Sequence, residues 1–308
     1  MKKAGIGICI AALTGILTAC GTEENTSVSE EEPLRILATT SQVGDMVNDI
    51  GGEYVEVETL MGPGVDPHLY QPTQEDIGKL ANADIIFYNG LNLEGNMQEV
   101  FDNVGSETTA VPVAENIPED MLQTEADSDS TDPHVWFDPD MWSYTADAVT
   151  EELSSLNAEN SEYYEQQGEA YKSMLTELDT YAEEELGRIP DESRVLVTAH
   201  DAFGYFGGAY DLEVEGLQGL STDSEYSVRD VDNIVNLLVE REIGAVFVES
   251  SVSGRSINAI IEGAARQDHE VEVGGELYSD AMGDAGTEEG TYEGMFRHNI
   301  DTIAGSLQ

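Results

Sequence analysis

The chain has 308 residues, enough for two domains of ordinary size or one large one, each with a real core. Its 12 Lys and Arg residues stand against 63 Asp and Glu residues, which gives a formal net charge of -51. A field of that sign repels nucleic-acid phosphates and anionic lipid headgroups, so the composition excludes a nucleic-acid-binding protein.

The N-terminus has the three-part pattern of an export signal. Two lysines precede an apolar stretch, Ala4 to Leu17, that is too short to span about 30 Å of hydrocarbon as a helix. The stretch ends in Leu-Thr-Ala-Cys-Gly, which resembles the bacterial lipobox. We therefore expect a signal peptide over residues 1–19 and lipid modification of Cys20, with a soluble export signal as the alternative.

Cysteine chemistry is confined to this leader. The only other cysteine is Cys9, so the body of the protein has no thiol for a disulfide, a zinc-thiolate site or a nucleophile. Residues 20–33 are acidic, carry almost no large apolar side chain and end in proline, which predicts an extended tether. Such a tether would keep a folded body near a membrane and let it reach a membrane partner.

Strand-like and helix-like segments alternate from Leu34 onward, first in a lobe that we assign to residues 34–158. Apolar runs predict strands, and helical spacing predicts helices, over 34–39, 42–50, 55–61, 74–81, 84–88, 97–104, 109–113 and a helix from Pro139 onward. This β-α-β-α order implies a mainly parallel sheet covered by helices. The polar stretch 123–132 predicts a mobile or surface loop.

The longest helical pattern covers residues 160–188, with apolar residues at three-, four- and seven-residue steps among many glutamates. Such a helix would be about 40 Å long, so we interpret residues 159–189 as a rigid bridge between two lobes. The second lobe, residues 190–308, repeats the alternation over 194–198, 202–210, 214–220, 228–241, 245–249, 255–266, 271–278 and 291–306. The expected fold is α/β, with two Rossmann-like lobes of mainly parallel sheet joined by one long rigid helix.

Four residues have the chemistry of a metal site. The tripeptide Asp-Pro-His occurs twice and ends at His68 and at His134, while His200 and Asp280 follow strand-like runs. In open α/β sheets, ligands collect outside the carboxyl ends of the strands. Three imidazoles and one carboxylate can saturate a four-coordinate ion, or a five- to six-coordinate ion if the carboxylate is bidentate and a water joins. We interpret these residues as one site in the cleft between the lobes.

Three carboxylates are candidates to support those ligands. Asp66 and Asp132 could accept the second ring proton of a histidine or a backbone donor, although simple turn chemistry explains them equally well. Glu249, in VFVESSVS, is a third candidate, since no paired base is visible for a nucleophilic role. The remaining histidines, His269 and His298, fit a surface turn and a structural helix position.

Common catalytic motifs are missing. The chain contains no GxxxxGK[ST], GxSxG or HExxH, so it should not itself hydrolyse ATP and we do not expect an enzyme. A metal-dependent hydrolase would use the same ligands with one position left to an activated water. A surface adhesin is the second rival, suggested by the lipid anchor and the tether.

Several ordered blocks of this sequence resemble a known family. The blocks are LMGPGVDPHLYQPT, DPHVWFDP, RVLVTAHDAFGYFG, GLQGLSTDSEYSVRDV, AVFVESSVS, GGELYSDAMG and GTYEGMFRHNI. Together they resemble the metal-binding lipoproteins of bacterial ABC importers. This is the TroA-like, cluster A-I solute-binding family, and the blocks are most similar to its manganese-binding branch. The resemblance covers nearly all of the chain from about Leu34. It implies a metal held between two lobes by His68, His134, His200 and Asp280.

The resemblance also implies partners and a location: an ABC permease, a separate ATPase subunit, and the extracytoplasmic face of the cell membrane, with the receptor a monomer. Two departures bear on the metal. Many manganese members have glutamate at the third ligand position, so His200 favours zinc; zinc members often have a histidine-rich loop, which residues 123–132 lack. Nitrogen-rich sites bind zinc more tightly whatever the biology. We expect Mn(II) as the transported ion, with Zn(II) as the alternative.

Overall fold

The computed structural model describes residues 32–104, 108–124 and 130–308. The predicted signal peptide, Cys20, most of the tether and the middle of the 123–132 loop lie outside these ranges. Within them, no helix combines the length and the apolar character needed to cross a bilayer. Every helix and strand expected from the sequence is present, with ends that differ by no more than two residues.

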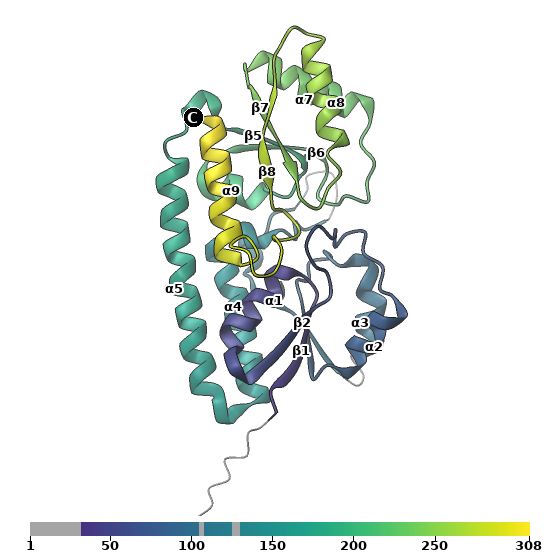
Figure 1. The fold of residues 1–308 in the computed structure, drawn as a ribbon, viewed down its shortest axis with the longest axis vertical. Coiled ribbons are helices and arrows are strands. Elements are labelled where there is room, and N and C mark those ends of the chain that lie inside the picture. Colours follow the sequence, from purple (N-terminus) through teal and green to yellow (C-terminus); the bar gives the residue numbers. More distant parts are fainter. Residues whose placement is uncertain (1–31, 105–107, 125–129) are drawn as a thin grey trace, which may run out of the picture. The chain divides into compact units, whose positions relative to one another are not determined.

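The first half of the body, residues 33–158, is built on a four-stranded parallel sheet in the order β2-β1-β3-β4 (Figure 1). Each connection between these parallel strands crosses over a face of the sheet, so the strands all end at the same edge. The elements are β1 (Leu34–Ala38), α1 (Ser41–Gly51), β2 (Val55–Thr59), α2 (Gln74–Asn82), β3 (Ile85–Tyr88), α3 (Gln98–Val104), β4 (Thr109–Pro112) and α4 (Pro139–Leu156).

Local sequence sets where these helices begin. Thr73 and Asp76 form a reciprocal capping box at the start of α2. Asp138 accepts two backbone N–H groups at the start of α4, and Pro139 occupies the first turn, where its missing N–H is not needed. The loops before both helices therefore end at defined positions, and both loops carry a predicted ligand.

The second half, residues 190–308, contains two pairs of parallel strands, β5 with β6 and β7 with β8. Its elements are β5 (Val195–His200), α6 (Gly204–Tyr210), β6 (Glu213–Gln218), α7 (Val228–Glu240), β7 (Ala245–Glu249), α8 (Arg255–Ala265), β8 (Glu272–Leu277) and α9 (Tyr292–Leu307). β5 and β7 lie side by side. At their ends, Glu249 Oε1 accepts the N–H groups of Ala199 at 2.8 Å and His200 at 2.9 Å. A side chain thus ties the end of β5 to β7.

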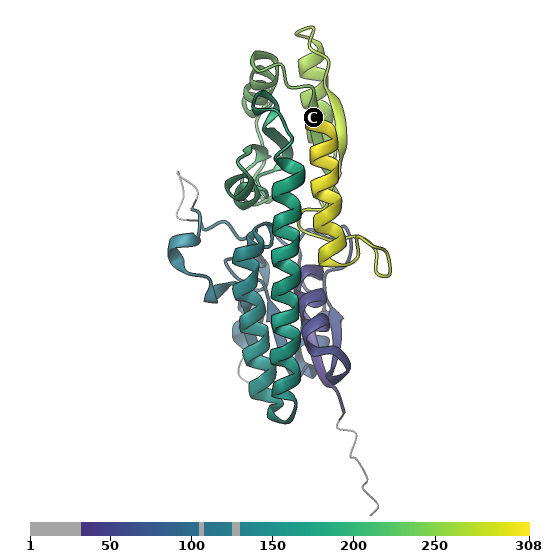
Figure 2. The same cartoon turned by 90° about the vertical axis from the view of Figure 1, so that its left-hand side faces the viewer.

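The long helix α5 (Ser161–Leu186) has 26 residues, which makes it about 39 Å long. One face is buried and the other carries the glutamates, as its sequence pattern predicts. It packs against α4 and α1 of the first half and against α9 and α6 of the second (Figure 2).

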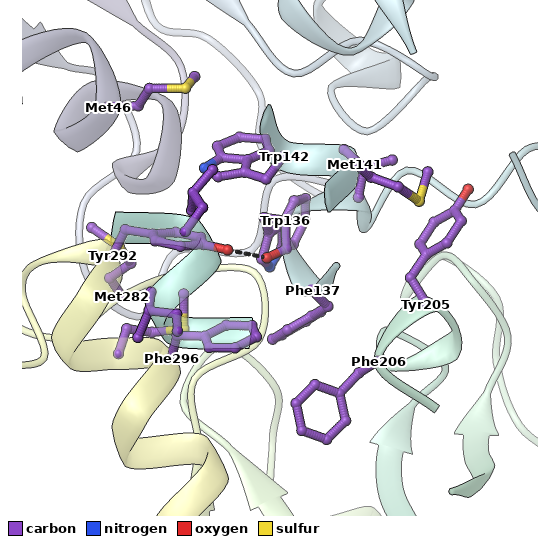
Figure 3. Packing of buried hydrophobic residues seen from close by; sticks show 14 of the residues in the cluster. Met46, Trp136, Phe137, Met141, Trp142, Tyr205, Phe206, Met282, Tyr292 and Phe296 are labelled. Atoms are coloured by element: carbon purple, nitrogen blue, oxygen red, sulfur yellow. Dashed lines mark hydrogen bonds between the residues drawn. The ribbon is translucent and has the colours of Figure 1, made fainter. Parts of the chain in front are cut away.

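An aromatic core joins the two halves (Figure 3). Phe137 stacks on Phe203 with ring centroids 4.3 Å apart, and Trp142 stacks on Tyr292 at 5.9 Å. The Tyr292 hydroxyl also donates to the carbonyl of Trp136 at 2.8 Å. Because interiors of this kind are close-packed, a large rotation of one half against the other would break contacts on both sides.

The shared core predicts that the halves unfold together. Leu178 of α5 is fully buried in this core, whereas Leu156 at the end of α4 is 45% exposed. We expect Leu178→Ala to lower the free energy of unfolding by about 2–5 kcal/mol, and Leu156→Ala to lower it by less than about 1 kcal/mol. Urea denaturation of the metal-free protein followed by circular dichroism measures both, and Leu178→Ala should shift one common transition. A second transition whose midpoint is unchanged in Leu178→Ala would show that the halves unfold separately.

Candidate metal centre

The four residues singled out in the sequence come together in the structure. His68, His134, His200 and Asp280 each offer a ligand atom, and these atoms all lie within 4.8 Å of one another. The Nε2 atoms of His68 and His134 are 3.3 Å apart. Asp280 lies between the other two imidazoles, with Oδ1 3.4 Å from Nε2 of His134 and Oδ2 3.4 Å from Nε2 of His200.

The two Asp-Pro-His repeats use the same backbone contact. Asp66 Oδ1 accepts the N–H of His68 at 2.9 Å, and Asp132 Oδ1 accepts the N–H of His134 at 3.0 Å. Asp132 makes a further contact, because the same oxygen lies 2.7 Å from Nδ1 of His134. At the second repeat, one carboxylate therefore both stabilises the turn and orients the imidazole ring.

His200 is the last residue of β5, and Glu249 at the end of β7 holds its ring. Nδ1 of His200 lies 2.6 Å from Glu249 Oε2, while the other carboxylate oxygen accepts the backbone N–H of the same histidine. A carboxylate on Nδ1 directs Nε2 toward the centre of the cluster.

The segment that carries Asp280 follows β8 but is held by residues of the first half. The carbonyl of Ser279 accepts hydrogen bonds from Gln42 Nε2 and Trp136 Nε1, both at 3.1 Å. Three residues after Ser279, the N–H of Met282 donates to Ser41 Oγ at 3.0 Å. Asp280 is thus fixed between two anchored neighbours.

Three residues of this support were not found by sequence analysis, Ser41, Gln42 and Trp136. Each contacts a residue more than 140 positions away in the chain. Gln42 is polar on a buried helix position, where it is 1% exposed, and its sequence context does not distinguish it from an ordinary surface glutamine. His269 and His298, which the sequence analysis did not predict as ligands, lie outside the cluster. The ring of His269 contacts the carbonyl of Ile243, and that of His298 contacts the carbonyl of Glu276.

Burial and neighbouring charges shift the pKa values of the donor groups. Burial lowers the pKa of His68 to about 3, and the neighbouring imidazoles add to this effect, so His68 is neutral at pH 7. Burial also disfavours a charged His134, but Asp132 and Asp280 outweigh it and raise the pKa of His134 to about 9. Burial would raise the pKa of Asp280, yet the histidines, His200 first, hold it well below its usual range. Asp280 is therefore an anion in the absence of metal.

Two atoms that face the centre lack a hydrogen-bond partner among the described residues, Nε2 of His200 and Oδ1 of Asp280. A buried polar atom left without a partner costs about 1–3 kcal/mol. A cation placed among the four donors would satisfy both atoms and would bring the imidazoles together without their mutual repulsion. The arrangement is therefore suited to holding a metal ion.

A cavity of about 570 Å³ opens beside this cluster, and of the four donors only His68 lines it. Its walls come from loops of both halves, including Leu91 and Asn92 of the first and Gly219 and Leu220 of the second. Leu91 and Asn92 both have positive φ angles, 52° and 65°, so the first wall is a tight turn.

A buried centre of three imidazoles and one carboxylate, supported by carboxylates and set between parallel-sheet halves that a long helix joins, defines a metal-binding protein of the α/β class. The family model for zinc-uptake complex component A, periplasmic, matches residues 36–306. The chain therefore belongs to this family of metal-binding, substrate-binding proteins of ABC importers, which are transport proteins and not enzymes.

Individual relatives are similar over their full length. The manganese-binding lipoprotein MntA of Bacillus subtilis is 48% identical over 306 residues, which cover 99% of this chain and 100% of the relative. The zinc-binding protein TroA of Treponema pallidum is 44% identical over 310 residues, covering 100% and 99%. The solved structure of periplasmic TroA from T. pallidum superimposes with a TM-score of 0.87 at 45% identity, covering 89% of this chain and 99% of that one. The α/β fold and the family predicted from the sequence are confirmed.

Proposed function

We propose that this protein is a lipid-anchored receptor that captures Mn(II) with His68, His134, His200 and Asp280 and delivers it to the permease of an ABC importer. The observation that carries the proposal is the convergence of these four buried donor groups within 4.8 Å. The membership of the chain in a family of substrate-binding proteins supports delivery to a permease that a separate ATPase drives.

The geometry of Asp280 supports manganese. Each of its carboxylate oxygens faces a different imidazole, so both oxygens can reach one ion placed among the donors. Three nitrogens and two oxygens make a five-coordinate shell, whereas structural zinc sites are almost always tetrahedral. Carboxylate ligands also suit manganese. The B. subtilis relative, 48% identical, is named for manganese binding.

Zn(II) is the alternative ion of the same site. Three imidazoles bind zinc well, and zinc forms tighter complexes than manganese with nearly any set of these ligands. The T. pallidum relative, 44% identical, is named for zinc binding. Affinity measured with purified protein therefore does not decide between the two ions.

The remaining features fit a tethered monomeric receptor on the extracytoplasmic face of the membrane. We propose a signal peptide over residues 1–19, lipid modification at Cys20 and a tether over 20–33, which the lipobox-like pattern and the lipoprotein name of the B. subtilis relative support. The folded body would comprise lobes 34–158 and 190–308, with 159–189 as the link.

The identity of the ion is tested in the organism's own cells. We expect protein purified from those cells to contain about one manganese per chain, and a deletion strain to grow poorly when manganese is scarce but normally when zinc is scarce. Elemental analysis by mass spectrometry and growth curves give the two readouts. Zinc in the purified protein together with a growth defect under zinc starvation would assign the receptor to zinc.

The ligand assignment is tested with alanine variants. We expect His68→Ala and Asp280→Ala each to reduce bound metal from about one ion per chain to near zero, because each removes one of few donors. His269→Ala is the matched control, since His269 contacts a carbonyl oxygen outside the cluster, and it should keep the metal. Elemental analysis after gel filtration, with circular dichroism to show folding, measures the outcome. A folded double variant that still holds one ion would refute the assignment.

The support of His200 by Glu249 gives a further prediction. Glu249→Gln keeps an oxygen for the two backbone N–H groups but removes the negative charge beside Nδ1 of His200. We expect metal affinity to fall about 10- to 100-fold. Asp230→Asn is the control, because Asp230 also accepts a backbone N–H, from Ser227, but makes no hydrogen bond with a histidine among the described residues. Competition with a chromophoric chelator measures both, and equal losses would contradict a specific role.

A further inference from the structure

His68 is the most weakly held of the four donors. It is 7% exposed, whereas Asp280 is 2% exposed and the other two histidines are fully buried. His134 and His200 each have a carboxylate beside Nδ1. Within the described residues, no carboxylate is paired with the ring of His68. An ion that leaves the cluster through the cavity would therefore pass the side on which His68 lies.

The His68 loop is held on two sides. Asn96 of the first half donates to the His68 carbonyl at 2.9 Å, and the loop is also fastened to the other half of the protein. Asp66 accepts the His68 N–H with Oδ1 and the hydroxyl of Thr222 with Oδ2, the latter at 2.6 Å. Thr222 follows β6, is 8% exposed and belongs to the 219–224 loop that forms the far wall of the cavity. One carboxylate thus connects His68 to that wall.

The loop that carries Thr222 is itself secured. Gln218, the last residue of β6, donates through Nε2 to the carbonyl oxygens of Thr222 at 3.1 Å and of Ser224 at 2.8 Å. A short hydrogen bond from a hydroxyl to a carboxylate, here the half-buried Asp66, is among the stronger contacts between a neutral and a charged group. The connection from β6 through Thr222 and Asp66 to His68 is therefore continuous.

His200 and Asp280 are fixed to parts of the protein that do not open easily. Asp280 follows Ser279, whose carbonyl is bound to α1 and to Trp136 of the aromatic core. His200 is at the end of a buried strand. Val65 and Tyr70, on either side of His68, are only partly buried where they pack against the core, so loosening this loop disturbs less packing than moving the other donors would.

We propose that the hydrogen bond between Thr222 and Asp66 is a latch that keeps His68 on the metal ion and sets the rate at which the ion leaves. This inference rests on the proposed function, because it takes His68 as a ligand. Thr222 is a positioning residue that acts through Asp66. A permease that displaces the 219–224 loop would break the latch and lower the barrier to release.

The test compares the release of Zn(II) and of Mn(II) from Thr222→Val, which keeps the shape of the side chain but removes the hydroxyl, with release from the wild-type protein. Full-length protein is loaded with one ion and mixed with excess chromophoric chelator in a stopped-flow instrument. We expect the dissociation rate to rise about tenfold, the lower end of the effect of residues that support ligands, with an unchanged association rate and an unchanged melting temperature of the metal-free protein. Thr222→Ser should release at close to the wild-type rate, because it restores the hydroxyl.

Two further variants separate a latch from a general loss of packing. Thr176→Val removes a hydroxyl that donates to a carbonyl of its own helix, Lys172 O, and should not change release. Asp66→Asn keeps an oxygen for the His68 N–H and weakens the acceptor of the Thr222 hydroxyl, so it should speed release. Combined with Thr222→Val it should add little, because both changes break one contact.

The outcomes separate the latch from the proposed function. A wild-type protein that takes up no ion overturns the proposed function and the latch with it. If the wild-type protein binds one ion and Thr222→Val releases it at the wild-type rate, the latch alone is overturned. The same conclusion follows if Thr176→Val speeds release equally, or if the effects of the Asp66 and Thr222 changes multiply.

Discussion

The site depends on keeping three imidazoles and a carboxylate buried within 4.8 Å of one another. Bringing these groups together removes each from water, which is unfavourable unless charge and hydrogen bonding compensate. Asp280 provides part of the compensation, since it lies between His134 and His200. Asp132 and Glu249 provide the rest from the outer side of the same two rings. The carboxylates therefore let the site exist before metal arrives, and an ion then replaces the protons that those contacts retain.

The aromatic core determines which part of this arrangement can move. Trp136 contributes to both systems, because its indole N–H holds the carbonyl before Asp280 and its own carbonyl accepts the Tyr292 hydroxyl. A rotation of the halves would have to disturb the core and the site together. The His68 loop is outside this coupling and borders the cavity. A rigid body with one movable donor can bind an ion tightly and still release it without unfolding.

Much of this could be predicted from sequence because the information is local. Apolar runs and helical spacing are properties of neighbouring residues, and a parallel β-α order brings strand ends to one edge, so His200 and Asp280 could be placed near the repeated Asp-Pro-His motifs. Glu249 was recognised only as a candidate, since nothing local shows that β7 lies beside β5. Thr222 sits in the polar run STDSEYS and contacts a residue 156 positions away. The pattern of α9 likewise shows which face is buried but not that this face meets the first half of the chain.

For the manganese receptor proposed above, the remaining physical problem is to discriminate between the two ions, and the strength of binding does not solve it. Zinc outcompetes manganese for nitrogen-rich ligand sets, and a net charge of -51 attracts both ions equally. Selection must then come from geometry or from the rate of release. A ligand shell in which the carboxylate binds through both oxygens is not the tetrahedral arrangement that zinc prefers. When His68 yields first, a four-coordinate zinc ion loses one of four ligands, whereas a manganese ion in the shell of three nitrogens and two oxygens loses one of five. Manganese would then be handed on more readily than zinc, so a site with higher affinity for zinc can still deliver manganese.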